Sequence, residues 1–126
     1  MKKSIYNIFL YIKKKHLWIV LTILLLILFF PLIRCETLTI VYGKQFEGLE
    51  LKTNMLIKSD YYKVINYENE EAQVYYVLKN VYGNTINFHK INDSWEIDNW
   101  NTVWSSTGSA SSVVWPYWWH FIYGGL

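Results

Sequence analysis

One uncharged stretch decides the architecture of this chain: residues 17–33, which read LWIVLTILLLILFFPLI. At about 1.5 Å of rise per residue, an α-helix of this length is about 25 Å long, which is close to the thickness of the apolar core of a bilayer. Pro31 falls in the last turn, where a break in the helix costs little. Trp18 and Phe30 stand near the two ends, as is typical of side chains at a membrane interface. The stretch therefore predicts one transmembrane helix.

The charges around this stretch predict its orientation. Residues 1–34 carry six basic side chains and no acidic one, and five of the six precede the span. Basic residues concentrate on the cytoplasmic side of transmembrane helices. We therefore expect a single-pass protein of the cell membrane, with residues 1–16 as a cytoplasmic basic segment and residues 17–34 as a signal-anchor helix. Residues 36–126 would then form an extracytoplasmic domain.

A cleaved signal peptide is the alternative interpretation of the same segment. Signal peptides have an apolar region of about 7–15 residues followed by a small-residue cleavage site. Here the apolar run is longer, and residues 31–37 read PLIRCET, without that site. Residues 32–35 are superficially similar to a bacterial lipobox, in which the Cys becomes lipidated, but Arg34 replaces the small residue that the motif needs. We therefore favour a retained anchor over cleavage or lipidation at Cys35.

The segment that precedes the span has one apolar helical face, formed by Ile5, Ile8, Phe9 and Ile12. This spacing suits a short amphipathic helix on the inner leaflet. It suits equally an extension of the anchor helix into the interface, which is the interpretation we favour.

After the membrane, runs of alternating apolar and polar residues predict an antiparallel β-meander. The expected strands are residues 37–42, 61–67, 72–79 and 85–91, and one that begins at Ser94, with connections at residues 68–71, 80–84 and 92–93. Phe46 and Leu49 predict a short amphipathic helix over residues 44–52, although Gly48 lies inside it. The expected fold class is α+β: a single transmembrane helix followed by a small antiparallel β-meander domain with a short helix.

This order of elements resembles the cystatin-like group of α+β folds, in which a curled sheet wraps a helix. A late strand of such folds often begins after a charged turn with a Trp and an Ile two residues apart, as residues 92–97 (NDSWEI) do here. The resemblance covers residues 37–105. Because such folds host enzymes, transport factors and binding modules, it implies a fold and no function.

The charge of the domain restricts its partners. Residues 35–126 carry six Lys and ten acidic side chains. Nucleic-acid binding needs a basic face on the domain, so a nucleic-acid partner is excluded. The basic excess near the membrane suits anionic lipid heads. We expect contact with the lipid bilayer through residues 17–33 and a protein partner at the membrane surface.

The sequence offers no catalytic or metal-binding signature. His89 and His120 are too few for a zinc site, and Cys35 stands in no ligand spacing with them. The carboxylates of Asp93, Glu96 and Asp98 gather near one turn, which is typical of a solvated strand face. Ser109 lies in a loop of small residues and not in a nucleophile elbow. We expect no enzymatic activity and no cofactor.

Aromatic residues crowd the C-terminal third. We assign Trp95, Trp100 and Trp104 to the core. Residues 113–123 read VVWPYWWHFIY, a run too short to cross a bilayer. It would complete the core, lie on the outer membrane surface, or form a recognition patch, since Trp and Tyr concentrate in binding hot spots. The candidate binding residues are Trp115, Tyr117, Trp118, Trp119, His120 and Tyr123.

These features predict a membrane-anchored, non-catalytic extracytoplasmic domain that binds another protein. The alternative function is a cell-wall glycan-binding module, in which exposed Trp faces would stack on sugar rings.

Overall fold

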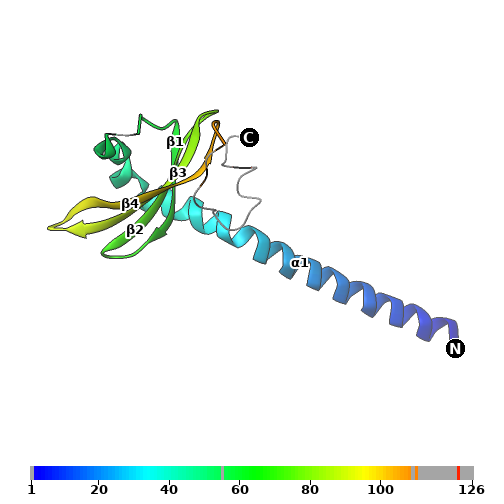
Figure 1. Ribbon diagram of the computed structural model, residues 1–126. Helices are drawn as coiled ribbons and strands as arrows, with labels where there is room; N and C mark the ends of the chain where they lie inside the picture. Colours follow the sequence, from blue (N-terminus) through cyan, green and yellow to red (C-terminus); the bar gives the residue numbers. More distant parts are fainter. Residues whose placement is uncertain (1, 55, 109, 111–121, 123–126) are drawn as a thin grey trace. The chain divides into compact units, whose positions relative to one another are not determined.

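The computed structural model describes residues 2–54, 56–108, 110 and 122, in which one long helix is followed by a four-stranded sheet (Figure 1). The chain divides into two compact units, Met1–Ile33 and Arg34–Leu126. This arrangement is the α+β layout that the sequence predicts, with an N-terminal apolar helix and an antiparallel meander.

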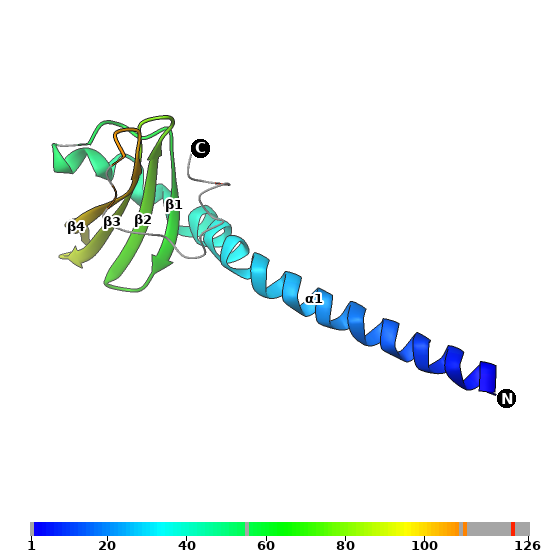
Figure 2. The same cartoon turned by 45° about the vertical axis from the view of Figure 1, so that its right-hand side comes forward.

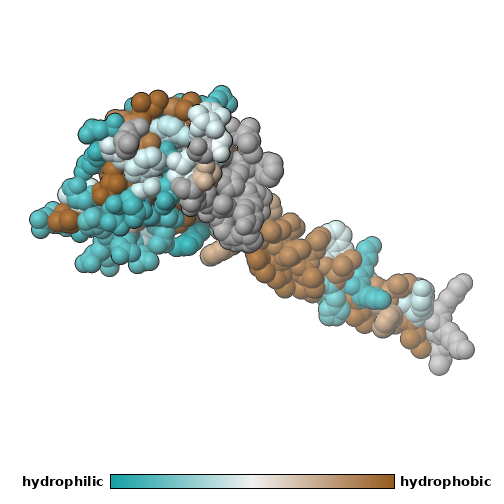
Figure 3. Space-filling model, viewed as in Figure 1, coloured by the Kyte–Doolittle hydropathy of each residue, from teal (hydrophilic) through white to brown (hydrophobic). Residues whose placement is uncertain are grey.

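Helix α1 (Lys2–Tyr42) contains the predicted span and is long and apolar enough, by length and composition, to cross a membrane. Figure 3 shows a hydrophobic surface along it, interrupted by one hydrophilic band. The helix continues through Pro31 instead of ending near it. Residues 2–33 form one unbroken helix, so the segment that precedes the predicted span is continuous with it and is not a separate helix.

The strand predicted at residues 37–42 is wrong, because these residues form the last turns of α1. Buried and half-buried side chains recur there with the i, i+3, i+4, i+7 spacing of a helix: Cys35, Leu38, Thr39 and Tyr42. The hydroxyl of Thr39 donates to the carbonyl of Cys35 and accepts from the N–H of Val64, both at 2.8 Å. Burial with a helical period outweighs the β propensity of this Thr- and Ile-containing segment.

The predicted short helix at residues 44–52 is split into two 3₁₀ helices, η1 (Gly43–Phe46) and η2 (Leu49–Thr53). Gly48 separates them with a φ of 77°, a left-handed conformation that glycine adopts without steric cost. Phe46 is fully buried, and Leu49 packs against the core at its edge. The two predicted apolar contacts are therefore made, by a tighter backbone than an α-helix.

The sheet consists of β1 (Tyr61–Tyr67), β2 (Glu71–Leu78), β3 (Tyr82–Ile91) and β4 (Ser94–Ser105). Neighbouring strands are antiparallel, in the order β1-β2-β3-β4 (Figure 2). The predicted tight turn is confirmed, since Asn92 and Asp93 have φ values of 49° and 62°, as a two-residue hairpin of type I′ requires. The predicted connection at residues 80–84 ends earlier, because Gly83 and Asn84 already pair within β3.

One face of the sheet, which we call the core face, packs against the end of α1 and against η1 and η2. The buried cluster consists of Phe46, Leu56, Val64, Ala72, Val74, Tyr76, Ile86, Phe88 and Trp95. The hydroxyl of Tyr76 donates to the carbonyl of Phe46 at 2.6 Å. The prediction that Trp95 and Trp100 belong to the core is confirmed, with Trp95 buried and Trp100 packed at its edge.

The opposite face, which we call the outer face, holds Trp104, so its assignment to the core is wrong. The indole N–H of Trp104 donates to the hydroxyl of Tyr75 at 2.8 Å. Tyr75 is buried but lies outside the core cluster, since neighbouring residues of a strand alternate between faces. A Cβ at Gly83 would collide with both side chains. A glycine is therefore required where Trp104 crosses β3.

Candidate functional site

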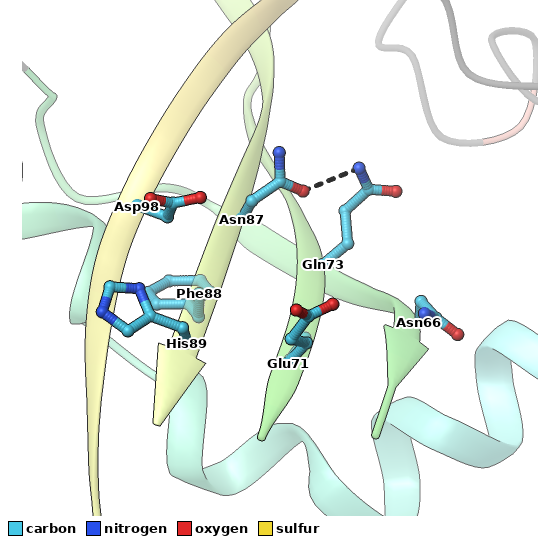
Figure 4. Close-up of a pocket in the computed structure, with 8 residues that line it drawn as sticks. Asn66, Glu71, Gln73, Asn87, Phe88, His89 and Asp98 are labelled. Atoms are coloured by element: carbon cyan, nitrogen blue, oxygen red, sulfur yellow. Dashed lines mark hydrogen bonds between the residues drawn. The ribbon is translucent and has the colours of Figure 1, made fainter. Parts of the chain in front are cut away.

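The outer face carries a hollow of about 280 Å³ (Figure 4). Its lining comes from all four strands: Asn66, Glu71, Ala72, Gln73, Asn87, Phe88, His89 and Asp98. Ala72 and Phe88 belong to the core cluster. The other six side chains are polar, and Figure 4 shows the amides of Gln73 and Asn87 pointing toward each other, joined by a hydrogen bond.

Two β-bulges flank the hollow. In β1 the pairing with β2 shifts between Val64 and Asn66. In β4, Ile97 and Asn99 pair with successive residues of β3, which leaves Asp98 as the extra residue. A bulge bends its strand and re-aims a side chain. The bulge in β4 therefore accounts for the position of Asp98, which pairs with no residue of β3 and lines the hollow.

A chain of side-chain hydrogen bonds crosses the site from β2 to β4. The amide of Gln73 donates to that of Asn87 at 2.9 Å, and Asn87 donates to Asn99 at 2.6 Å. Asn99 in turn donates to the carboxylate of Asp98 at 3.2 Å. Each amide nitrogen carries two N–H groups, and this chain uses one of them. The remaining N–H groups and carbonyl lone pairs are suited to a polar ligand.

The charge of the site is mainly negative. Glu71 and Asp98 supply exposed carboxylates, and the acidic turn that contains Glu68 and Glu70 adjoins Glu71 in a second, shallower depression. One basic side chain contacts a lining residue, since the guanidinium of Arg34 donates to the side-chain oxygen of Asn66 at 2.8 Å. A ligand that carries positive charge would therefore be favoured.

The site supplies hydrogen bonds and charge for binding. Among the described residues, no hydrogen bond joins His89 to the carboxylates of Glu71 or Asp98, and the carboxylate of Asp98 accepts from Asn99. Within the same residues, no group of three or more His, Cys, Asp or Glu side chains is placed to hold a metal ion.

The candidate binding residues predicted from the sequence all lie outside the described residues: Trp115, Tyr117, Trp118, Trp119, His120 and Tyr123. The structure therefore does not place them relative to the hollow.

The structure does describe the acidic residues of the last hairpin and the single cysteine, which the sequence also singled out. Asp93, Glu96 and Asp98 are exposed as expected, although only Asp98 lines the hollow. Glu96 instead lies 3.7 Å from the ammonium of Lys52. Cys35 is buried, and burial raises the pKa of its thiol to about 12, which disfavours the reactive thiolate.

Sequence reasoning missed the hollow itself. Strand alternation places His89 with Asn87 on the face opposite the core, which the structure confirms. The same alternation in β2 places Gln73 on the face of the sheet opposite to that of Val74 and Tyr76. The position of Gln73 beside Asn87 depends on the register between β2 and β3, which alternation alone does not give. The bulges in β1 and β4, which flank the hollow, have no recognisable pattern in the sequence.

Comparisons with protein families, with curated proteins and with solved structures found no match to this chain. The cystatin-like resemblance therefore stays a prediction about the fold.

Proposed function

We propose that this chain is a single-pass membrane protein whose non-catalytic extracytoplasmic domain binds a partner protein at the membrane surface. The observation that carries the proposal is the polar hollow on the outer face, with its chain of amides that ends at Asp98. The apolar helix α1 supports the membrane anchor.

The hollow favours a basic segment of the partner. A Lys or Arg side chain would meet the carboxylates of Glu71 and Asp98 and donate hydrogen bonds to the carbonyl oxygens of Gln73 and Asn87. Because these groups are partly or fully exposed, the complex should weaken as salt is added.

Capture of the partner from intact membranes tests the role of the hollow. The native chain should recover one defined protein, and Glu71→Gln combined with Asp98→Asn should lose it. Glu47→Gln is the matched control, since it removes an exposed carboxylate outside the hollow. Equal recovery by the double variant and the native chain would contradict the proposal.

The aromatic tail requires a separate variant. Trp118→Ala with Trp119→Ala should reduce capture if residues 113–123 form part of the same surface, since large rings dominate binding hot spots. Undiminished capture would remove the tail from the binding surface without affecting the hollow.

The proposed orientation rests on the basic residues that precede the span. A C-terminal epitope should be removed by protease added to sealed cells that lack any outer barrier, whereas an N-terminal epitope should survive. The reverse pattern would place the hollow in the cytoplasm.

The glycan-binding alternative needs exposed Trp faces. Among the described residues of the second unit, Trp95 is buried, whereas Trp100 and Trp104 are half-buried. The alternative therefore depends on Trp residues of the tail. Quenching of Trp fluorescence by soluble cell-wall fragments would favour it, and an unchanged spectrum would count against it.

A further inference from the structure

The outer face of the sheet is buried at one end, although it is polar and solvated around the hollow. The residues at the buried end are Tyr75 and Val77 of β2, Gly83 and Thr85 of β3 and Trp104 of β4, which we call the outer cluster. Tyr75 and Val77 are 0% exposed, and Thr85 is 3% exposed. Since Tyr75 and Val77 do not belong to the core cluster, the sheet carries a second group of buried side chains.

The burial pattern along the strands shows that both faces are covered at this end. A strand with one covered face alternates between buried and more exposed residues, as β2 does from Glu71 to Val74. Residues 74–77 are then buried in succession, and so are residues 83–86 of β3. Unbroken burial of this kind is typical of strands that are covered on both faces.

The described residues supply part of the cover on the outer face. Among them, four apolar side chains of α1, η1 and η2 lie at the core cluster: Leu38, Tyr42, Phe46 and Leu49. On the outer face, the side chains of Trp104 and Tyr75 converge at Gly83, where an added Cβ would collide with both. Trp104 is itself only half-buried. Because the burial of the outer cluster arises within a single chain, neither lipid nor a second copy accounts for it.

The chain leaves the sheet beside this cluster. β4 ends at Ser105, and the N–H of Ser106 donates to the carbonyl of Val81 at 2.8 Å, in the turn between β2 and β3. Residues 106–112 then lead to the aromatic tail, residues 113–123. At about 3.3 Å per residue, these seven residues can span about 23 Å, which exceeds the width of four strands spaced about 4.8 Å apart. The tail is therefore long enough to reach any strand of the outer face.

The composition of the tail suits an apolar surface. Residues 105–126 contain no Asp, Glu, Lys or Arg, and most of residues 113–123 are aromatic. A run of such rings in water would form a large exposed apolar patch, whereas its burial against Tyr75, Val77 and Trp104 is favourable.

We propose that the aromatic tail packs across the outer cluster and forms a second, smaller core on the outer face. The row of Tyr75 and Thr85 adjoins the row of Gln73 and Asn87, so the packed tail borders the hollow.

Cysteine labelling of the full chain in detergent micelles tests this cover. Thr85→Cys places a thiol in the outer cluster, where a polar maleimide should not label it. Combined replacement of the three Trp residues of the tail by Ala should add one label per chain, at position 85. Glu71→Cys is the control, because it is exposed on the same face and should be labelled with or without these rings. Buried Cys35 reports unfolding, since it gains a label only if the domain opens.

Disulfide trapping tests the same contact while most rings of the tail stay in place. Thr85→Cys or Val77→Cys is combined with one Cys scanned through residues 113–121. A mild oxidant should give an intramolecular disulfide at one or more tail positions, since the bond requires Cβ atoms about 3.8 Å apart. Asp93→Cys is the control, because it lies at the far end of β3 and should pair with none of them.

The two measurements together decide the proposal. If the loss of the rings labels Cys35 as well as position 85, the domain has opened, and disulfide trapping alone gives the answer. Absence of any intramolecular disulfide from positions 77 and 85 overturns the proposal, as expected if the tail lies on lipid. Disulfides that form only between two chains overturn it too, because the tail would then cover a neighbouring copy.

Discussion

The two faces of the sheet are organised by different forces. On the core face, rings from three elements lie in contact, as Phe46 does with Phe88 and Trp95 at centroid distances of 5.3 Å and 5.1 Å. On the outer face, side-chain amides of Gln73 and Asn87 bond to one another while still reaching water. Burial of apolar area stabilises the first face, whereas hydrogen bonds in competition with water add little to stability on the second. Changes on the core face should therefore affect folding, and changes in the hollow should affect binding.

Phe46→Ala, on the core face, should lower the free energy of unfolding more than any outer-face substitution. Phe46 is fully buried, and its removal would leave a cavity between η1 and the sheet. We expect a loss of about 3–5 kcal/mol in the free energy of unfolding. Denaturant titration of the full chain in detergent micelles, followed by near-ultraviolet circular dichroism, measures it.

Gln73→Ala is the outer-face counterpart and should cost less than about 1 kcal/mol. If the two substitutions cost the same, the faces would not differ in the way proposed.

Two adjacent tyrosines allow the two faces to be compared within one strand. Tyr75 and Tyr76 lie on opposite faces of β2, and both are buried. Burial raises the pKa of each phenol above its ordinary value of 10.0. Above about pH 10 the unfolded chain loses these protons while the folded domain keeps them. Stability should therefore be fully present below that pH and should fall as the pH rises towards the folded-state pKa.

Tyr75→Phe and Tyr76→Phe should each flatten this alkaline decline. At neutral pH each costs about 1 kcal/mol, because Trp104 loses its acceptor in one variant and the Phe46 carbonyl loses its donor in the other. The free energy of unfolding measured from about pH 8 to about pH 11 tests this. An unchanged slope in both variants would show that these phenols do not control it.

Much of the core face was predictable from the sequence because it follows a periodic pattern. Val74 and Tyr76 alternate in β2, as do Ile86 and Phe88 in β3, and the turn at Asn92 and Asp93 was recognisable from its residue types. The end of α1 was not predictable in this way. Thr37 to Tyr42 satisfies both a strand pattern and a helical one, and only contact with the sheet decides between them.

The hollow was less predictable, because it depends on how strands align. Alternation assigns His89 and Asn87 to a face, but it does not say which residue of β2 lies beside them. Asp98 reaches the site only through a bulge, an insertion whose position depends on the pairing of β3 with β4. Polar residues on a solvated face also carry no hydrophobic signal that would reveal their register.

Asn87→Ala should have the smallest effect on folding and still a clear effect on function. Asn87 is the middle of the amide chain, and it is half-buried, so water replaces its hydrogen bonds when it is removed. We expect stability to change by less than about 1 kcal/mol. Capture of the partner should weaken by about tenfold, equivalent to about 1.4 kcal/mol, because Gln73 and Asn99 lose the residue that orients them. Asn101→Ala is the control, since Asn101 lies in β4 on the same face but does not line the hollow. If both variants bind equally well, the amide chain has no part in recognition, and the outer face would differ from the core face in stability alone.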